Sequence, residues 1–420
     1  MARRYFGTDG VRGVVGESLT PDLVERLGRA ATLWAQAERV FVGRDTRVSG
    51  AELEDALVRG IVSAGATAVL GGVLPTPAVA LSALDLGVVI SASHNPPEYN
   101  GVKFFDARGR KLADAQEEEV EALLEARAAG SGVVEHDGGA LERYMEYVCA
   151  HFGTALDGLR VGVDCANGAL WRAGPEVFRR LGAEVVAIGA ADRGDLINVG
   201  CGATDLGALR RLVGDERLDL GVAFDGDGDR MLAVDERGEV VDGDQIVAVL
   251  ALDLGVDVVA VTEVTNQGFH ALMAERGVRV ITTDVGDRYV LEALEREGGV
   301  LGGEQSGHLI YLRDHVSGDG LAAALLLCAA LRGRRLSEAA AVMPRFAQAK
   351  ADVRVASKAV PASVRAAVER LNAELRGRGR VLVRPSGTEP VVRVLAEAEN
   401  QEEARDACAS VATLLEEELG

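Results

Sequence analysis

Long apolar runs are missing from this 420-residue sequence. The longest, Leu321–Leu331, falls short of the about 20 residues that a membrane-spanning helix needs, so it is interpreted as a buried helix. No apolar segment follows the arginines near the N-terminus, and the sequence therefore predicts no signal peptide. Both absences favour a cytoplasmic protein with no membrane partner.

Cysteine is scarce as well, and its spacing excludes two kinds of site. The five cysteines are widely scattered and include no CxxC pair; they are Cys149, Cys165, Cys201, Cys328 and Cys408. This pattern argues against a disulfide framework and against a zinc site. It favours a reducing compartment.

Lysine is the rare basic residue. Only four of the 45 lysine and arginine residues are lysines: Lys103, Lys111, Lys350 and Lys358. Where a fixed cation is enough, this sequence usually has arginine. A lysine beside a candidate nucleophile therefore suggests a need for a titratable amine, because a guanidinium does not give up its proton.

Positive charge is in deficit overall. The 65 acidic residues give a formal net charge of −20, which argues against a nucleic-acid partner and against binding to anionic lipid. The hydrophobic content of 48% is enough for a large core, and the length predicts about two to four domains. An anionic substrate would need local clusters of arginine and lysine.

Short apolar runs alternate with helical patterns through most of the chain. The first such stretch predicts a strand at Arg39–Gly43, a helix at Gly50–Ala64 and a strand at Thr67–Gly71. Similar alternation restarts near Leu159 and again after Asp242. This pattern predicts three related α/β modules with largely parallel sheets.

The last segment has a different pattern. We expect a helix at Ala362–Leu375, two strands at Arg380–Val383 and Val391–Ala396, and a final helix capped by Asn400. Linkers are expected at 128–139 and 343–361. The predicted domains are 1–148, 149–242, 243–350 and 351–420.

The first motif that carries chemistry is Ile90–Pro96, which follows a predicted strand. Its Ser93 stands next to His94, and Lys103 follows shortly after. Loops at the carboxyl ends of strands are where α/β sheets bind ligands, so Ser93 is a candidate nucleophile. The alternative is an ordinary Asn-Pro turn.

The second motif is the run Asp225–Arg230, with carboxylates at alternate positions separated by glycines. Asp225, Asp227 and Asp229 could converge on one hard cation such as magnesium. An EF-hand is rejected, because Arg230 stands where that loop requires glycine and both flanks are predicted strands. A solvated acidic turn is the remaining alternative, but three carboxylates this close repel one another unless a cation bridges them.

Two further motifs are rich in glycine and polar groups. Gly302–His308 could hydrogen-bond sugar hydroxyls, with His308 as an acid or base; a flexible hairpin is the alternative. Arg384–Pro390, with Arg393 beyond it, could bind an anion through backbone amides, hydroxyls and guanidinium groups. The alternative there is an ordinary Ser-Gly turn.

Together and in this order, the four motifs resemble those of the phosphohexomutase family, and the likeness covers essentially the whole chain. It extends to Tyr5–Gly13, Gly43–Arg47 and Val285–Val290. Within the family, the chain is most similar to the bacterial branch that acts on glucosamine phosphates. Two departures are Glu263 and Gln267, in a segment expected to be more apolar, and the chain is somewhat shorter than that branch.

The resemblance implies a heart-shaped enzyme of four domains around a central cleft. Three would be mixed α/β domains with mostly parallel sheets, and the smaller C-terminal one an α+β domain of the TATA-binding-protein type. The implied activity is the interconversion of glucosamine 6-phosphate and glucosamine 1-phosphate by intramolecular phosphoryl transfer. Mg²⁺ would be the cofactor, and glucosamine 1,6-bisphosphate the intermediate and activator.

The resemblance also implies roles for individual residues. Ser93 would be the phosphoserine and would complete the metal site of Asp225, Asp227 and Asp229. The catalytic group would further include Arg12, His94, Lys103 and His308. The substrate-binding group would comprise Arg230, Asp287, Arg288, Glu304, Ser306, Arg384, Ser386, Gly387, Thr388 and Arg393.

Three alternatives stay open at this point. One is the same chemistry on glucose or mannose phosphates, because no physical reasoning from the sequence identifies the 2-amino group. Another is a metal-dependent sugar phosphatase, since the same carboxylates and serine could serve hydrolysis. The third is a sugar-phosphate sensor without catalysis. The oligomeric state also stays open, with a homodimer as one option.

Overall fold

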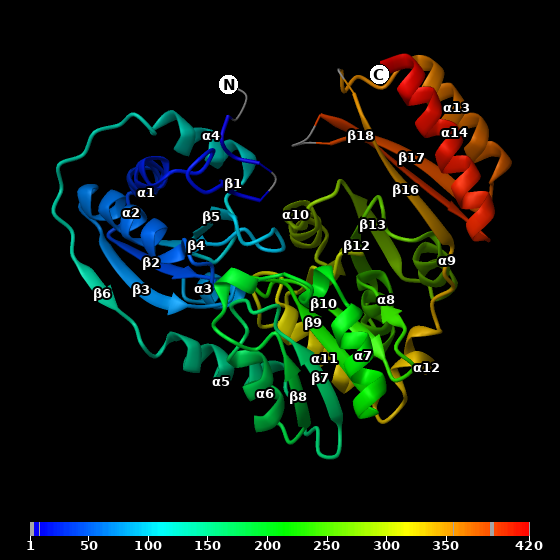
Figure 1. Cartoon of the computed structure of the whole chain (residues 1–420), viewed down its shortest axis with the longest axis horizontal. Coiled ribbons are helices and arrows are strands. Elements are labelled where there is room, and N and C mark those ends of the chain that lie inside the picture. The colour runs from blue at the N-terminus through cyan, green and yellow to red at the C-terminus, as the bar shows by residue number, and fades with distance from the viewer. Residues whose placement is uncertain (1–3, 8, 356, 387–389, 420) are drawn as a thin grey trace.

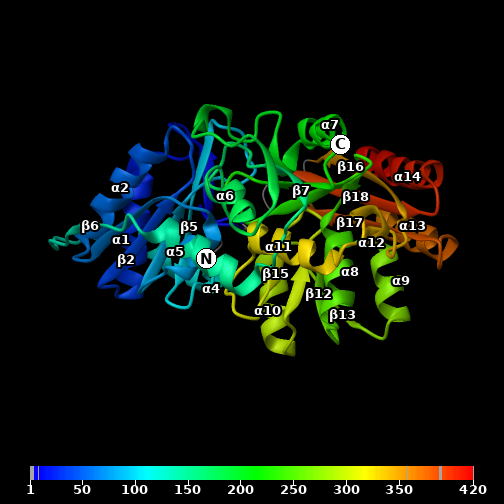
Figure 2. The same ribbon diagram turned by 90° about the horizontal axis from the view of Figure 1, so that it is seen from below.

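The computed structural model describes residues 4–7, 9–355, 357–386 and 390–419. Four sheets, of six, five, four and three strands, follow one another along the chain. Each sheet with its helices forms one unit, named here domains I to IV (Figure 1). Seen from below, domain I and domain IV lie at opposite ends, with domains II and III between them (Figure 2).

Domain I has a mostly parallel sheet with strand order β1-β5-β4-β2-β3-β6, in which β5 runs antiparallel to both of its neighbours. Its strands are β1 (Val11–Val14), β2 (Arg39–Arg44), β3 (Thr67–Val73), β4 (Leu86–Ile90), β5 (Tyr99–Asp106) and β6 (Val134–His136). Its helices are α1 (Pro21–Ala35), α2 (Gly50–Ser63), α3 (Thr76–Leu81) and α4 (Asp114–Ala122). The helix α5 (Ala140–Phe152) leads into domain II.

Domain II repeats this plan with strand order β11-β10-β9-β7-β8, where β9, β7 and β8 are parallel. Its strands are β7 (Arg160–Asp164), β8 (Glu184–Ile188), β9 (Leu220–Phe224), β10 (Met231–Asp235) and β11 (Val240–Val241). Its helices are α6 (Ala173–Arg180) and α7 (Gly207–Glu216), with 3-10 turns η1 (Gly194–Leu196) and η2 (Gly202–Thr204).

Domain III has strand order β13-β12-β14-β15, with only β15 antiparallel. Its strands are β12 (Val258–Thr262), β13 (Arg279–Thr283), β14 (Leu301–Gly303) and β15 (Leu309–Tyr311). Its helices are α8 (Gly243–Leu254), α9 (Gln267–Glu275), α10 (Asp287–Glu297), α11 (Gly320–Leu331) and α12 (Leu336–Ala340). The apolar run that ends at Leu331 thus forms α11, and Leu321 is fully buried, as predicted.

Domain IV is smaller and has an antiparallel sheet with strand order β16-β18-β17. Its strands are β16 (Ala347–Arg354), β17 (Gly379–Pro385) and β18 (Val391–Ala398), and its helices are α13 (Ala362–Glu374) and α14 (Gln401–Leu419). Asn400 accepts a hydrogen bond from the backbone of Glu403 at 2.9 Å, which confirms the predicted cap. The prediction of mixed, mostly parallel α/β domains followed by a small C-terminal domain is confirmed.

Two stretches predicted to be linkers contain strands instead. β16 lies within the expected linker 343–361, and β6 lies within 128–139. β16 pairs along its whole length with β18. Its sequence AQAKADVR alternates apolar and polar residues, but three of the four apolar positions are alanine, which favours strands only weakly, so the alternation was not recognised as a strand. The C-terminal sheet therefore has three strands where the sequence predicted two.

The apolar cores show how the domains are connected. One cluster of buried side chains runs through domains I, II and III and includes Phe41, Phe224 and Phe269. Domain IV has a separate core around Val381 and Val392. Among the helices of the described residues, none combines the length and apolar character needed to cross a bilayer.

Domains II and III are also joined through their backbones. The amide of Met231 donates to the carbonyl of Gly307 at 2.9 Å, and that of Gly320 donates to Gly228 at 3.0 Å. Arg230 and His308 form an antiparallel bridge beside them. These contacts fix the loop after β9 against the loop after β14 and the start of α11.

Candidate active site

The loop that holds Ser93 begins where β4 ends at Ile90. Ser93 has a left-handed backbone (φ 53°), and its amide donates to the Ser91 hydroxyl at 2.9 Å. Its carbonyl accepts hydrogen bonds from Arg47 at 2.9 Å and from Asn198 at 2.8 Å. These contacts aim the buried Ser93 hydroxyl at domain II, where it donates to Asp225 Oδ2 at 2.5 Å.

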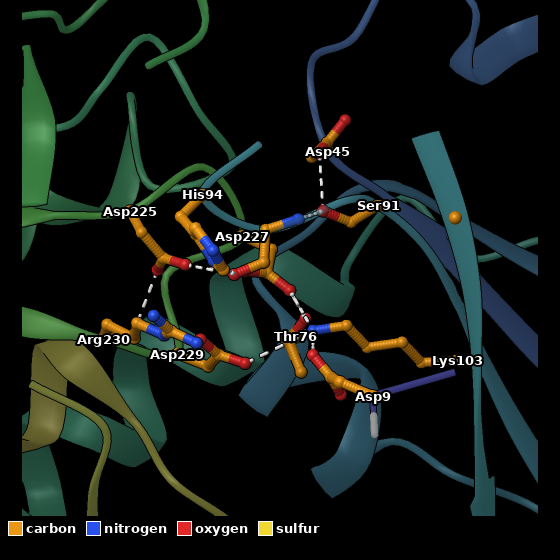
Figure 3. A network of polar contacts seen from close by, with 12 residues as sticks. Asp9, Asp45, Thr76, Ser91, His94, Lys103, Asp225, Asp227, Asp229 and Arg230 are labelled. Atoms are coloured by element: carbon orange, nitrogen blue, oxygen red, sulfur yellow. Dashed lines mark hydrogen bonds and ion pairs between the residues drawn. The ribbon is translucent and has the colours of Figure 1, made fainter. Parts of the chain in front are cut away.

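A fully buried arginine shapes this loop. Arg47 binds Asp45 Oδ2 through its Nε at 2.9 Å. Ser91 donates to the same oxygen at 2.6 Å (Figure 3). The Arg47 guanidinium also donates to backbone carbonyls of the loop, including that of Asn95 at 2.8 Å. The run Gly43–Arg47 therefore supports the serine loop, and none of its residues lines the cavity at which the four domains meet.

The acidic loop follows β9, which ends at Phe224. A Cβ atom on Gly226 would lie 2.5 Å from the carbonyl of Ser93, so only glycine allows the two loops to meet this closely. One carboxylate oxygen from each of Asp225, Asp227 and Asp229 lies within 4.8 Å of the others. The three side chains are buried.

Two of these carboxylates each have an oxygen that lacks a hydrogen-bond donor. Asp227 Oδ1 and Asp229 Oδ1 are buried, and neither accepts a hydrogen bond from any described residue. Buried anionic oxygens without partners are costly. A hard cation ligated by oxygen would satisfy both atoms, so the donor set fits Mg²⁺.

Lys103 supplies positive charge beneath the acidic loop. From its buried position on β5, its amine lies 2.7 Å from Asp227 Oδ2, 3.0 Å from Asp9 Oδ2 and 3.4 Å from Asp229 Oδ2 (Figure 3). Burial alone would lower the pKa of Lys103, but Asp227 and Asp9 raise it above its ordinary value. In this arrangement the Lys103 amine balances negative charge of the acidic loop.

The aspartates of the loop have opposite pKa shifts. Burial, followed by the charges of Asp229 and Asp227, raises the pKa of Asp225 well above its usual range. Burial would also raise the pKa of Asp229, but Lys103 and His308 hold it well below that range. The repulsion that Asp225 experiences is the kind that a bound cation relieves.

The loop after β14 carries the groups expected to contact a sugar. Glu304 Oε1 accepts a hydrogen bond from the amide of Gly286 at 3.0 Å, and Ser306 donates to Glu304 Oε2 at 3.4 Å. His308 Nε2 lies 3.1 Å from Asp287 Oδ2, and its Nδ1 lies 3.6 Å from Asp229 Oδ1. Burial would lower the pKa of His308, but these two carboxylates raise it.

Domain IV contributes a pair of arginines. Arg384 on β17 and Arg393 on β18 are directly opposite each other in the antiparallel sheet. Burial, and next the charge of Arg393, lowers the pKa of Arg384. Two guanidinium groups held this way attract an anion, and Ser386 lies beside them. Gly387 and Thr388, also predicted to bind phosphate, lie outside the described residues.

One cavity of about 170 Å³ brings the four domains together. It is lined by Asp9, Arg12, His94, Lys111, Asp229, Arg230, Val285, Gly286, Asp287, Glu304, His308, Arg384, Ser386 and Arg393. Ser93, Lys103, Asp225 and Asp227 lie directly beneath its lining, in contact with one another or with Asp229.

Two predicted residues have environments that the sequence did not indicate. Arg288 does not line the cavity, because its guanidinium binds Glu117 and Asp114 of α4. His94 Nδ1 lies 3.3 Å from the Ser93 hydroxyl. Burial, and then nearby Arg230 and Arg12, lowers the pKa of His94 to about 3, so this imidazole is neutral.

Sequence reasoning missed several members of the site. Asp9 forms ion pairs with Arg12, Lys103 and Lys111, and Lys111 also binds Asp287. Thr76 donates to Asp227 Oδ2 at 2.6 Å. The scarcity of lysine could have indicated Lys111, whereas nothing in the sequence around Thr76 connects it with a loop 151 residues away.

Comparisons with known proteins agree with this architecture. Sequence models of the four phosphoglucomutase/phosphomannomutase domains match residues 3–130 (alpha/beta/alpha domain I), 142–238 (domain II), 242–346 (domain III) and 341–414 (C-terminal domain). The chain therefore belongs to the phosphoglucomutase/phosphomannomutase family, the phosphohexomutases that its motifs resemble.

Two relatives carry a more specific name. The phosphoglucosamine mutase of Moorella thermoacetica is 49% identical, over 95% of this chain and 96% of its own. That of Pelotomaculum thermopropionicum is 46% identical, over 98% and 99%.

Solved structures share the fold. A putative phosphomannomutase from Thermus thermophilus has a TM-score of 0.80 and 27% identity, covering 98% of both chains. The N-acetylphosphoglucosamine mutase of Aspergillus fumigatus, solved with GlcNAc-6P and magnesium, has a TM-score of 0.72 and 20% identity, over 99% of this chain and 96% of its own.

Proposed function

We propose that the protein is a phosphoglucosamine mutase, which interconverts glucosamine 6-phosphate and glucosamine 1-phosphate through a phosphorylated Ser93. One observation carries the proposal: the Ser93 hydroxyl lies 2.5 Å from Asp225, in the loop whose three aspartates can share one cation. Asp229 of this loop, Arg384 and Arg393 line the same cavity. Relatives 46% and 49% identical over nearly the whole chain bear this name.

The walls of the cavity have separate tasks in this proposal. Glu304, which lines the cavity, binds sugar hydroxyls together with Ser306, which does not line the cavity but donates to Glu304 from the same loop. The phosphate that does not react lies on Arg384, Ser386 and Arg393, with Gly387 and Thr388 of the same loop. Arg12 and Arg230 neutralise charge at the reacting phosphoryl group.

Asp225, Asp227 and Asp229, with the phosphorylated Ser93, would hold Mg²⁺. Mg²⁺, when bound, supplies charge neutralisation at the phosphoryl group. Lys103 balances the remaining negative charge from below, since its amine contacts Asp227 and Asp229. His94, which is neutral, orients the serine oxygen.

Proton transfer falls to His308 in this proposal. Its imidazole lines the cavity between Asp287 and Asp229 and can exchange a proton with a sugar hydroxyl. The 1-hydroxyl of glucosamine 6-phosphate gives its proton to His308 and attacks the phosphoryl group of Ser93. The bond between phosphorus and the serine oxygen breaks, the serine regains a proton as the hydroxyl that donates to Asp225, and glucosamine 1,6-bisphosphate results. The bisphosphate then turns over, so that its 6-phosphate returns to Ser93 and the 1-phosphate leaves.

Water is the competing acceptor. A phosphoserine open to solvent would be hydrolysed, and the enzyme would act as a phosphatase. Ser93 is only 1% exposed, and the aspartates around it are equally enclosed. Burial of the phosphoryl donor therefore favours transfer to a bound sugar.

A substrate panel tests the proposal. Isomerisation of glucosamine, glucose and mannose 6-phosphates is measured with Mg²⁺ and a catalytic amount of the matching 1,6-bisphosphate. Glucosamine phosphate is expected to turn over fastest, and the active protein is expected to carry one added phosphate, about 80 Da, on Ser93. A faster rate with glucose or mannose phosphate would contradict the assigned sugar. Phosphate release in excess of isomerisation would contradict mutase activity.

A further inference from the structure

The start of α10 contacts three separate parts of the molecule through three consecutive residues. Gly286 donates its amide to Glu304 Oε1 at 3.0 Å, in a backbone conformation (φ 140°) that favours glycine. Asp287 contacts His308 Nε2 at 3.1 Å and forms an ion pair with Lys111. Arg288 crosses to domain I and binds Glu117.

The contact made by Arg288 is buried and has two arms. Its Nη2 donates to Glu117 Oε1 at 2.6 Å, and its Nη1 donates to Glu117 Oε2 at 3.3 Å and to Asp114 Oδ1. Arg288 is 6% exposed and Glu117 is 3% exposed. Both terminal nitrogens of the guanidinium are thus engaged by α4 of domain I.

The two sides of this contact carry different parts of the proposed chemistry. Ser93 and Lys103 belong to domain I, whereas Glu304 and His308 belong to domain III. The sugar must lie between them with its hydroxyl aligned on the phosphoryl group. A misplacement of about 1 Å can cost roughly 100-fold in rate.

We propose that Arg288 is a positioning residue that sets the register between domains I and III, by anchoring the start of α10 to Glu117. Through the adjacent Gly286 and Asp287, this anchor determines where Glu304 and His308 stand relative to Ser93. The inference rests on the proposed mutase function and replaces the expectation that Arg288 binds substrate directly.

A second ion pair across the same interface provides the control. Arg110 of domain I binds Glu295 near the other end of α10, at 2.7 Å, and the Glu295 side chain is 45% exposed. Among the described residues, the ion pair of Glu295 joins it to Arg110 and not to the loop of Glu304 and His308. Glu295→Gln therefore weakens the interface between the domains without disturbing residues 286–288.

The experiment compares Arg288→Met, Glu117→Gln, their double variant, Arg288→Lys and Glu295→Gln in the full-length protein with Mg²⁺. We measure kcat, KM for the sugar phosphate, and the ratio of phosphate release to isomerisation. Arg288→Met and Glu117→Gln should each lower kcat roughly 10- to 100-fold and raise that ratio, with KM changed less than kcat. Glu295→Gln should match the wild type.

The double variant and the conservative variant separate positioning from other roles. Arg288→Met and Glu117→Gln both break the contact between these two residues. The double variant should therefore lose no more activity than the less active single variant. Arg288→Lys keeps the charge but cannot bind Glu117 and Asp114 with two arms, so its kcat should lie between those of Arg288→Met and the wild type. If Arg288→Met does not fold, the loss of kcat in Glu117→Gln and the smaller loss in Arg288→Lys test the inference.

Two results would overturn the inference. If Arg288→Met raises KM and Glu117→Gln does not, Arg288 binds substrate directly. If both variants keep the wild-type kcat and ratio, the contact has no influence on the reaction. Failure of the proposed function is distinct, because the wild type itself would then not isomerise glucosamine phosphate.

Discussion

The two ends of the cavity differ in how closely their charged groups contact one another. At the Ser93 end, three carboxylates, Lys103 and the serine hydroxyl are buried and in mutual contact. At the domain IV end the ion pairs are longer, with Arg384 at 4.0 Å from Glu263 and Arg393 at 3.7 Å from Asp352.

The domains at the two ends of the cavity also differ in how their apolar cores are connected. The Ser93 end belongs to domains that share one apolar core and are joined by backbone hydrogen bonds. Domain IV has its own core and meets domain III through polar side chains, as where Lys350 binds Gln305 at 2.7 Å. We infer from these cores that the Ser93 end is pre-formed, whereas the other end would be completed by the substrate phosphate of the proposed reaction.

The first prediction concerns the pre-formed end and has the largest expected effect. Ser93→Ala removes the atom that carries the phosphoryl group in the proposed mechanism, so sustained isomerisation should be abolished. The measurement is turnover with saturating glucosamine 1,6-bisphosphate. Ser63→Ala, a change at a helix serine whose hydroxyl donates to the carbonyl of Gly60, should keep full activity. Near-normal turnover by Ser93→Ala would rule out the covalent route.

The second prediction concerns the proposed metal site at the same end. Asp227→Asn keeps the shape of the side chain but removes charge from a group that contacts Lys103 and Thr76. We expect kcat to fall by about 100-fold or more, with a higher Mg²⁺ concentration for half activation. Asp235→Asn is the matched control, because Asp235 ends β10 in the same domain and accepts hydrogen bonds from the backbone of the following hairpin turn. Unchanged Mg²⁺ dependence in Asp227→Asn would contradict the metal assignment.

How far the sequence predicts the site also differs between local and distant contacts. The run from Asp225 to Asp229 could be interpreted alone, because its spacing converges carboxylates within one loop. The serine loop could be placed at a strand end, but its support by Arg47 could not, since this depends on carbonyls of residues 93–99.

The same distinction holds for the fold. Short apolar runs between helical patterns predicted the parallel strands. A strand that is buried on both faces of its sheet needs apolar residues along its whole length. β16 was missed because its pairing with β18, and not its composition, makes it a strand. Arg288 was assigned to the substrate through the family resemblance of Val285–Val290, and nothing in the sequence indicated its partner on α4, which is 171 residues away.

The third prediction concerns the end that the substrate completes. Arg384→Met removes one cation from the proposed phosphate cradle, so KM for the sugar phosphate should rise about 10- to 100-fold, with a smaller change in kcat. Arg378→Met, in the same domain, is the control, because Arg378 binds Glu403 at 3.1 Å and lies outside the cavity lining. A loss confined to kcat would indicate that Arg384 acts at the reacting phosphoryl group.

The fourth prediction, with the smallest effect, concerns the polar junction that carries domain IV. Burial, followed by the charge of Asp242, raises the pKa of Asp244 from 3.8 to about 7. Asp244 Oδ2 accepts a hydrogen bond from the amide of Asn266 at 2.8 Å and lies 3.3 Å from Gln305 Nε2. A carboxyl bound by neutral amides is thus placed where domain III meets domain IV.

The sign of the pH dependence follows from this raised pKa. Between about pH 4 and pH 7 the unfolded chain has released the proton of Asp244 while the folded protein still holds it, so the free energy of unfolding falls as pH rises. Asp244→Asn removes this loss and keeps an oxygen for the Asn266 amide. The free energy of unfolding of the variant, relative to that of the wild type, should therefore increase by roughly 1–3 kcal/mol when the pH is raised from about 5 to about 8. Denaturant unfolding at both pH values measures the gain, and parallel pH curves would show that Asp244 is not the group responsible.

The same variant separates the junction from the pre-formed end. Asp244 makes its hydrogen bonds at the junction and not with Ser93 or the aspartate loop. The relative change of kcat at saturating substrate should therefore be smaller than the relative change of the unfolding equilibrium constant.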